Sequence, residues 1–261
     1  MPIAINRGKC VGCGRCARVC ALGVLTMADG VPAISREERC IHCHHCYAAC
    51  PAGAIALDGL DARAARTPGA AASPEGVMAL LERRYSCREY SPDAVSAEDL
   101  ALLRRALETA PTGCNARATR YVVFDTPERT QSFREEFRRR IESSGAAADS
   151  PTIRTLRVML RLQPDPILRG APHAIVACHR ADAPTGLVDC VIGLSHFEFV
   201  AQALGLGTCW CGFVPLAAKD AWPTLAQDIG LPEGFVLGYA MLFGHKAFDY
   251  ARPVSPNPLG Q

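Results

Sequence analysis

The chain repeats a run of four closely spaced cysteines in its N-terminal part. The first run reads C-x2-C-x2-C-x3-C and ends at Cys20, and the second has the same spacing and ends at Cys50. The stretches that follow also match, ALGVLTM after the first run and PAGAIAL after the second. Such self-similarity indicates a duplicated supersecondary unit. Eight of the 14 cysteines therefore belong to one repeated pattern, which constrains the fold of this segment more than its apolar residues do.

Cysteine thiolates at this spacing are typical ligands of [4Fe–4S] clusters, which take four thiolates each. The first three cysteines of a run bind one cluster, and the fourth faces the cluster of the other run. The spacing therefore predicts two [4Fe–4S] clusters with crossed ligands. The ligands of one would be Cys10, Cys13, Cys16 and Cys50, and those of the other Cys40, Cys43, Cys46 and Cys20.

Two zinc sites are the alternative, although zinc usually takes two separated pairs of cysteines rather than a crowded triplet. Three histidines, His42, His44 and His45, stand among the cysteines of the second run. They could act as ligands or tune a cluster, but with four cysteines in each set we interpret them as exposed spacers. Residues 1–59 resemble the bacterial two-cluster ferredoxins, which implies a small ferredoxin-like domain that transfers electrons.

Composition and charge argue against several classes of protein. The net charge of +2 is close to neutral, so nothing indicates a surface for nucleic acid or for a membrane. The first residues lack a charged segment followed by a long apolar run, so no signal peptide is predicted. The apolar stretch 186–207 contains Asp189, His196 and Glu198 and predicts a buried helix rather than a membrane span. Metal-binding cysteines without a secretory signal indicate the reducing cytoplasm.

Residues 60–74 are rich in Ala, Gly, Pro and Ser and predict a linker. From residue 75 to residue 261 the mixed helical and strand patterns predict an α+β domain. Ser73 followed by Pro74 is a typical helix start, and Ser96 opens a second helix that Pro111 stops. Asp29-Gly30 predicts a hairpin turn. Further helices are expected over residues 128–142, 152–163 and 188–204, and strands over residues 121–125, 174–179 and 235–243.

Three local patterns in the larger domain point to a bound anion and a flat ligand. Residues 84–88 read RYSCR, and two guanidiniums with a hydroxyl can grip a phosphate. Residues 110–115 read APTGCN, a loop whose small residues let backbone approach a flat ligand. Residues 204–212 read LGLGTCWCG, a glycine-rich exit from the predicted buried helix. Each pattern alone is weak evidence for a binding site. Clustered arginines, for example, more often form a solvated face.

Taken in order, these patterns resemble the nitroreductase family over about residues 75–252. A fourth matching element is Gly244-His-Lys246 at the end of the last strand, followed by Arg252. The resemblance implies an α+β fold with a central antiparallel-type sheet flanked by helices. It also implies FMN as cofactor, bound at the interface of an intertwined homodimer. The apolar helix over residues 188–204 would then form the dimer core.

The resemblance further implies which residues hold FMN. The residues expected at the phosphate and ribityl end are Arg84, Tyr85, Ser86, Arg88 and Arg252. The residues expected along the isoalloxazine ring are Pro111, Thr112, Gly113, Asn115 and Arg117, and Trp210, Cys211 and Gly212 would reach its N5 and O4 edge. Arg117 stands where the family has Gln, so it would bring a positive charge toward the ring. The six cysteines outside the runs are interpreted as small buried residues, although Cys209 or Cys211 could reach the flavin.

These expectations describe an enzyme in which flavin N5, rather than a catalytic side chain, carries the chemistry. Its acceptors would be nitroaromatics, quinones or similar electron-poor compounds. Electrons would reach FMN through the two clusters from a donor such as ferredoxin, or from NAD(P)H directly. The alternative is an electron-transfer partner or redox sensor without small-molecule turnover. Reductive dehalogenation or ring reduction is a third reading that these residues leave open.

Overall fold

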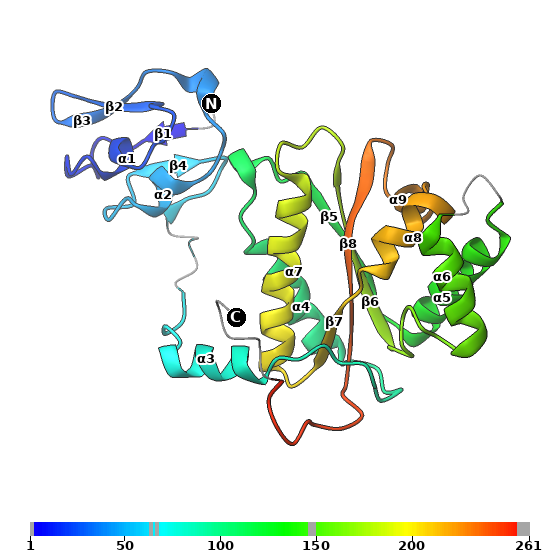
Figure 1. Cartoon of the computed structure of the whole chain (residues 1–261). Coiled ribbons are helices and arrows are strands. Elements are labelled where there is room, and N and C mark those ends of the chain that lie inside the picture. The colour runs from blue at the N-terminus through cyan, green and yellow to red at the C-terminus, as the bar shows by residue number, and fades with distance from the viewer. Residues whose placement is uncertain (1–2, 63–64, 66–67, 146–149, 255–261) are drawn as a thin grey trace, which may run out of the picture. The chain divides into compact units, whose positions relative to one another are not determined.

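A computed structural model describes residues 3–62, 65, 68–145 and 150–254 of the chain. Two compact units make up the fold (Figure 1). Unit 1 comprises Met1–Ala71 together with Cys114–Ala116, and unit 2 comprises Ala72–Gly113 with Arg117–Gln261. The boundary after Ala71 falls inside the segment 60–74 expected to be a linker. Residues 63–64 and 66–67 of that segment lie outside the described residues.

Unit 1 shows the duplication that the cysteine runs predict. Each run leads into a one-turn helix that carries its third cysteine, and an antiparallel ladder joins the two ends of the unit. The turn Asp29-Gly30 closes a hairpin in which Ala28 faces Val31, as predicted. The elements are β1 (Ile3–Ile5), α1 (Arg15–Arg18), β2 (Leu25–Ala28), β3 (Val31–Ile34), η1 (Glu37–Arg39), α2 (His45–Ala48) and β4 (Ile55–Leu57).

The two cysteine loops share one backbone conformation but use different residues to reach it. Gly12 and Gly14 have φ of 67° and 69° in the first run, and His42 and His44 have φ of 53° and 61° at the matching positions. A side chain at Gly12 would place its Cβ 2.8 Å from the carbonyl oxygen of Gly30, so glycine is required there. Histidine tolerates the left-handed region better than most residues do.

Asp58 holds the two left-handed histidines of the second run. Its two carboxylate oxygens lie 2.8 Å from His42 Nδ1 and 3.0 Å from His44 Nε2. These hydrogen bonds keep the pKa of the Asp58 carboxyl below its usual value. The histidines are therefore part of a hydrogen-bonded loop rather than free spacers.

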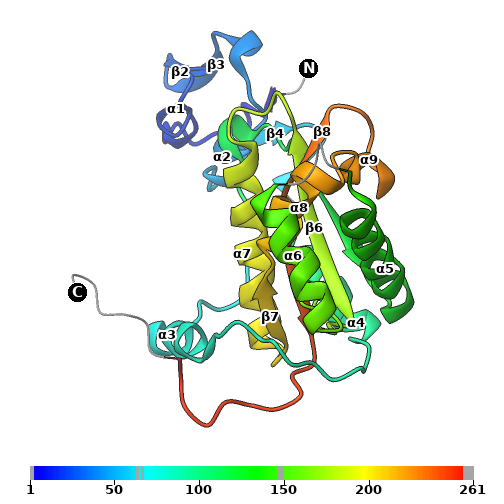
Figure 2. The ribbon, with the colours of Figure 1, turned by 45° about the vertical axis from the view of Figure 1, so that its right-hand side comes forward.

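Unit 2 is a four-stranded antiparallel sheet in the order β5-β6-β8-β7 (Figures 1 and 2). This confirms the expected central antiparallel sheet flanked by helices. Helices α4 and α7 cover one face, and α5, α6 and α8 cover the other. The strands are β5 (Thr119–Phe124), β6 (His173–Arg180), β7 (Gly207–Trp210) and β8 (Phe235–Gly244).

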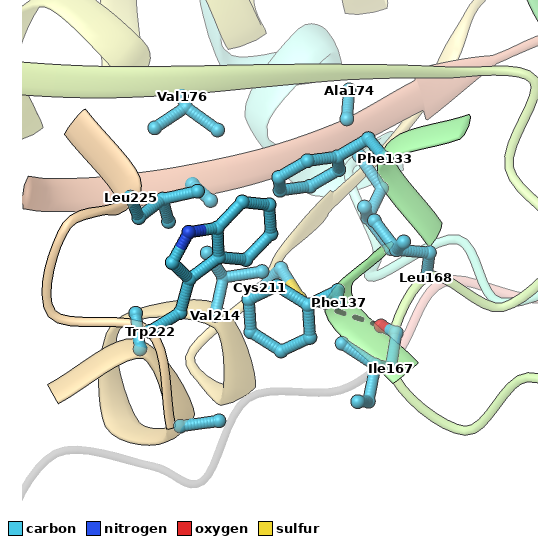
Figure 3. Packing of buried hydrophobic residues seen from close by; sticks show 14 of the residues in the cluster. Phe133, Phe137, Ile167, Leu168, Ala174, Val176, Cys211, Val214, Trp222 and Leu225 are labelled. Atoms are coloured by element: carbon cyan, nitrogen blue, oxygen red, sulfur yellow. Dashed lines mark hydrogen bonds between the residues drawn. The ribbon is translucent and has the colours of Figure 1, made fainter. Parts of the chain in front are cut away.

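Alternation along the two central strands divides the interior into two apolar layers. Ile175 and Ala177 of β6 face α4 and α7, whereas Val176 and Cys178 face the layer beneath α5, α6 and α8. Figure 3 shows this second layer, where the rings of Phe133, Phe137 and Trp222 pack against one another at tilted angles. The sheet is therefore buried on both faces, which fixes its strand register.

The helix starts follow the sequence closely. The Ser73 hydroxyl accepts a hydrogen bond from Gly76 N at 3.0 Å, and Ser96 caps Asp99 N at 3.1 Å. Gly205, at φ 77°, follows α7 as its left-handed stop. The helices are α3 (Pro74–Arg83), α4 (Ala97–Glu108), α5 (Pro127–Ser143), α6 (Pro151–Leu162), α7 (Gly186–Ala203), α8 (Phe213–Ala221) and α9 (Leu225–Asp228), with η3 (Gly113–Asn115).

Within the described residues, no helix combines the length and the apolarity needed to cross a bilayer.

Candidate functional site

The RYSCR segment lies directly against the glycine-rich segment after α7. Ser86 forms an isolated parallel bridge with Thr208, and Cys87 N donates to the carbonyl oxygen of Thr208 at 2.8 Å. Thr208 lies in β7, which is the edge strand of the sheet. The fold therefore brings together two of the three predicted site segments, although more than a hundred residues separate them in sequence.

A buried carboxylate, Glu198 of α7, ties these two segments together. One of its oxygens accepts from the Thr208 hydroxyl at 2.8 Å, and the other accepts from Trp210 Nε1 at 2.9 Å. The Arg84 guanidinium lies 3.7 Å from the same carboxylate. Sequence reasoning did not identify Glu198 as a site residue. The available signal was an acidic residue inside an otherwise apolar helix, which rarely stays buried without partners.

Arginine side chains gather around the buried thiol of Cys209. Burial raises the pKa of this thiol, and the guanidiniums of Arg169, Arg88 and Arg84 act in the opposite direction. Arg88 and Arg169 have no carboxylate partner among the described residues. The oxygens of Glu198 already accept two other hydrogen bonds. This end of the sheet is therefore a cationic site able to receive an anion.

Arg169, which sequence reasoning missed, belongs to a rigid loop between α6 and β6. It has a left-handed backbone, with φ of 52°. Asp165 fixes the loop by accepting from Leu168 N at 2.9 Å, Gly170 N at 2.8 Å and Arg134 Nε at 2.6 Å. A side chain held in this sparsely populated region by a fully bonded loop is typical of functional positions.

The C-terminal segment runs alongside the first site segment. The rings of Tyr85 and Tyr250 stack with centroids 3.7 Å apart, and the Tyr85 hydroxyl donates to the carbonyl oxygen of Phe248 at 3.2 Å. Tyr85 is buried, and this burial raises its pKa to about 12. Arg252, predicted at the phosphate end, is exposed two residues beyond Tyr250.

Most cysteines outside the runs face the core of unit 2. Cys211 N donates to the carbonyl oxygen of Ala240 at 2.9 Å, while its thiol points toward Ile167 in the apolar layer (Figure 3). Burial raises its pKa to about 12. The Cys211 thiol thus faces the core, and Gly212 follows as the first residue before α8. Cys114 is the exposed exception.

The remaining predicted segment, residues 110–115, begins at the opposite end of α7, where Pro111, Thr112 and Gly113 belong to unit 2. Gly113 N donates to the buried carboxylate of Asp189 at 3.1 Å, and Arg117 N donates to the Thr112 hydroxyl at 3.0 Å. Asp189 and Glu198 are nine residues apart in α7, which corresponds to about 13 Å along a helix. Thus the chain does not bring Pro111, Thr112 and Gly113 beside its own RYSCR segment.

The middle of this loop belongs to unit 1. Asn115 Nδ2 donates to the carbonyl oxygens of Ile41 at 3.0 Å and His42 at 2.8 Å. Asn115 therefore lies beside the second cysteine loop.

Arg117 returns to unit 2 and lines an open cleft of about 600 Å³ between α4 and β5. Asp125 pairs with two of the cleft's arginines, Arg104 at 2.6 Å and Arg129 at 2.7 Å.

The first predicted set of cluster ligands lines one enclosed cavity in unit 1. Cys10, Cys13, Cys16 and Cys50 all border it. Burial raises the pKa of the Cys16 thiol, and the nearby thiolates of Cys50 and Cys10 raise it further. Backbone amides approach two sulfurs of this set: Gly12 N lies 3.5 Å from Cys10 Sγ, and Ala54 N lies 3.2 Å from Cys50 Sγ.

The second set shows the same arrangement. Burial raises the pKa of the Cys46 thiol to about 11, and the nearby thiolates of Cys43, Cys20 and Cys40 add to this effect. Burial also acts on Cys20, but surrounding backbone amides outweigh it and lower the pKa of that thiol. Val24 N lies 3.2 Å from Cys20 Sγ. The fourth cysteine of each run thus joins the other run's loop.

Comparison with known proteins assigns the larger unit to a family. The model of the nitroreductase family matches residues 81–245, which is more than half of the chain. The chain belongs to the nitroreductase family. A 4Fe-4S dicluster domain model matches residues 9–55. The protein is therefore an oxidoreductase of this family with an N-terminal 4Fe-4S ferredoxin domain.

Individual relatives agree with this assignment. A protein of Archaeoglobus fulgidus, whose name places it among NADH dehydrogenases/NAD(P)H nitroreductases, is 24% identical over 66% of this chain and 86% of its own length. A solved nitroreductase of Desulfitobacterium hafniense with bound FMN is 27% identical, with a TM-score of 0.57 over 69% of this chain and 94% of its own. A nitroreductase of Bacteroides fragilis with bound FMN shares the fold, with 18% identity and a TM-score of 0.59 over 70% and 95%.

Proposed function

We propose that this protein is an FMN-dependent reductase of nitroaromatics, quinones or similar electron-poor acceptors. Electrons would come through two [4Fe–4S] clusters or from NAD(P)H directly. The observation that carries this proposal is the cationic site formed where the RYSCR segment meets β7. We also propose that domains 1–59 and 75–261, joined by linker 60–74, work together in the cytoplasm.

The residues at the cationic site fit FMN. Arg84, Ser86 and Arg88 provide two guanidiniums and a hydroxyl for its phosphate, and Arg169 adds a further cation at the same site. Bound FMN would supply the one- and two-electron chemistry, while the protein orients and tunes the ring. The solved Desulfitobacterium hafniense relative, which holds FMN, supports this assignment.

A second copy of the chain would complete the site. Because Pro111, Thr112 and Gly113 lie at the far end of α7, we propose that a homodimer partner completes the flavin site. It would bring its Pro111, Thr112, Gly113, Asn115 and Arg117 to the flavin. The exposed side of α7 suits such contact, since Leu187 and Val188 are 52% and 57% exposed and Phe199 is also exposed. Large apolar side chains in one row on a surface helix are typical of an interface.

The cysteine sets fit [4Fe–4S] clusters in both chemistry and position. The four cysteines of the first set border one cavity, and backbone amides point at sulfurs of both sets, as cluster loops require. We therefore propose two clusters, one on Cys10, Cys13, Cys16 and Cys50, and one on Cys40, Cys43, Cys46 and Cys20.

The test is anaerobic turnover of the full chain with a panel of nitroaromatic and quinone acceptors. Reduced ferredoxin and NAD(P)H are compared as donors, after FMN, iron and acid-labile sulfide have been measured. We expect steady acceptor reduction with at least one donor. If the protein holds FMN and clusters and exchanges electrons but turns over no acceptor, it is an electron-transfer partner or redox sensor instead.

A further inference from the structure

The cysteine loop of the first run lies in a strongly cationic stretch. Arg7, Lys9, Arg15 and Arg18 flank its ligands, and the first acidic residue of the chain is Asp29. All four basic side chains are exposed. None of them pairs with a carboxylate among the described residues. This loop therefore carries four unscreened positive charges on a chain whose net charge is only +2.

The same loop contains the most accessible cluster ligand. Cys13 is exposed, whereas the other seven cysteines of the two runs are buried or partly buried. Val11, two residues before it, is 69% exposed. Met27 of the hairpin is also exposed and lies against the backbone at Gly14. Val11 thus stands between the basic residues in sequence, and Met27 lies against Gly14, the residue that follows Cys13.

The second cysteine loop has a different surface. Arg36 and Arg39 flank Glu37 and Glu38 before it, and Asp58 holds two of its histidines. Charges of both signs are mixed there, so the strongly positive field belongs to the first loop alone.

We propose that Arg7, Lys9, Arg15 and Arg18, with Val11 and Met27, form a docking surface for an acidic one-electron carrier protein. We call these residues the first-run face. The carrier would give one electron to the cluster on Cys10, Cys13, Cys16 and Cys50. The carrier is oxidised by one electron, the cluster is reduced by one, and no bond forms or breaks. This inference rests on the proposed clusters and adds where their electrons enter.

The physical reasons are charge and distance. Contacts between redox proteins are small and short-lived, so steering by opposite charges largely sets their rate of encounter. A carrier seated beside exposed Cys13 is separated from the cluster by little protein. A nucleic acid would also be attracted by positive charge, but its binding requires neither an exposed cluster ligand nor an exposed apolar side chain such as Val11.

The test measures reduction of the clusters in the full-length protein by stopped-flow absorbance under anaerobic conditions. One donor is a reduced acidic ferredoxin and the other is the methyl viologen radical, which is a cation. The variant Arg15→Glu/Arg18→Glu reverses two charges of the first-run face. The matched control, Arg36→Glu/Arg39→Glu, makes the same change before the second run. Iron and sulfide contents show first that every variant carries its clusters.

With ferredoxin at about 0.02 M salt, we expect Arg15→Glu/Arg18→Glu to lower the second-order rate constant by about tenfold. The difference should shrink at about 0.3 M salt, where charges are screened within a few ångströms. With methyl viologen the same variant should be reduced as fast as the parent or faster. The control variant should stay within about twofold of the parent with both donors.

Binding supplies a readout that does not depend on electron transfer. Oxidised ferredoxin titrated calorimetrically should bind the Arg15→Glu/Arg18→Glu variant more weakly, and the control variant as it binds the parent. Equal ferredoxin rates in parent and variant, or an equal loss in the control, would overturn the proposal. So would duplex DNA that binds the parent more tightly than ferredoxin does and loses this binding in the variant. Absence of iron and sulfide in the parent would instead contradict the proposed clusters themselves.

Discussion

Replacement of Glu198 by Gln tests how the two halves of the cationic site are held together. Gln keeps the length of the side chain, removes its charge and exchanges one acceptor oxygen for an NH2 donor. Trp210 Nε1 can only donate, so it keeps the remaining oxygen. The Thr208 hydroxyl must then accept from the new amide, and its own hydrogen loses the acceptor that it had at 2.8 Å.

The expected cost follows from these bonds. Hydrogen bonds to a charged group contribute about 1.5–3 kcal/mol, neutral ones about 0.5–1.5 kcal/mol, and a buried orphaned hydroxyl costs about 1–3 kcal/mol. Burial of an amide is less unfavourable than burial of a carboxylate and offsets part of this loss. We expect Glu198→Gln to lower the free energy of unfolding by about 2 kcal/mol. For a domain of this size the melting temperature should fall by about 4–8 °C.

FMN affinity should change in the opposite direction. Removal of this negative charge from the site should favour a bound phosphate by about 0.6 kcal/mol, or about threefold in Kd, which is the size of the interaction between unit charges several ångströms apart in a water-like dielectric. Circular dichroism melts of the apoprotein and fluorescence titrations with FMN measure the two effects. Glu135→Gln, the same change at an exposed position of α5, is the control. If Glu198→Gln weakens FMN binding, the carboxylate orients Arg84 for the phosphate and the charge argument is wrong.

Three further predictions concern other parts of the chain. Cys20→Ser should damage the cluster of the second run and Cys50→Ser that of the first, as judged by electron paramagnetic resonance; damage to the same cluster by both would contradict crossed ligands. Arg117→Gln should lower the flavin midpoint potential in anaerobic spectroelectrochemistry, because a nearby positive charge favours the anionic hydroquinone; an unchanged potential would mean that Arg117 points away. Burial lowers the pKa of His173, so its contribution to stability is complete above pH ~6.5 and declines as the pH falls below it. Thermal melts at several pH values should show that acidification lowers the stability of His173→Gln less than that of the parent.

The features that sequence predicted well depend on neighbours in the chain. The Asp29-Gly30 turn, the Ser73 cap and the stop at Gly205 each follow from the chemistry of a few adjacent residues. The largely apolar helix expected over residues 188–204 also followed from sequence, because a long helix without a polar face is expected to be buried. These elements were confirmed with shifts of one or two residues at their ends.

The features that sequence could not supply depend on distant partners. The sequence predicts a glycine-rich exit from a helix over residues 207–210. These residues instead form β7, because they pair with residues of β8 such as Phe243 and Leu242. Helix α8 was not expected, since its short apolar sequence has no polar face to mark it. Nothing in the sequence marks Arg169, because only the fold brings its guanidinium close enough to act on the Cys209 thiol.

The near-neutral charge of the chain conceals a division between paired and unpaired cations. On the α5 side of unit 2, arginines are matched by acids, as in the pairs of Arg140 with Glu136 at 2.7 Å and of Arg134 with Asp165 at 2.6 Å. The basic residues near Arg88 and on the first-run face differ, because among the described residues Arg88, Arg169 and the four cations of the first-run face have no carboxylate partner. The near-neutral net charge gave no indication of an anionic partner, whereas the distribution of ion pairs indicates two sites where an anionic partner could bind. One place suits a small phosphate and the other an acidic protein, in line with the proposed delivery of electrons to a flavin.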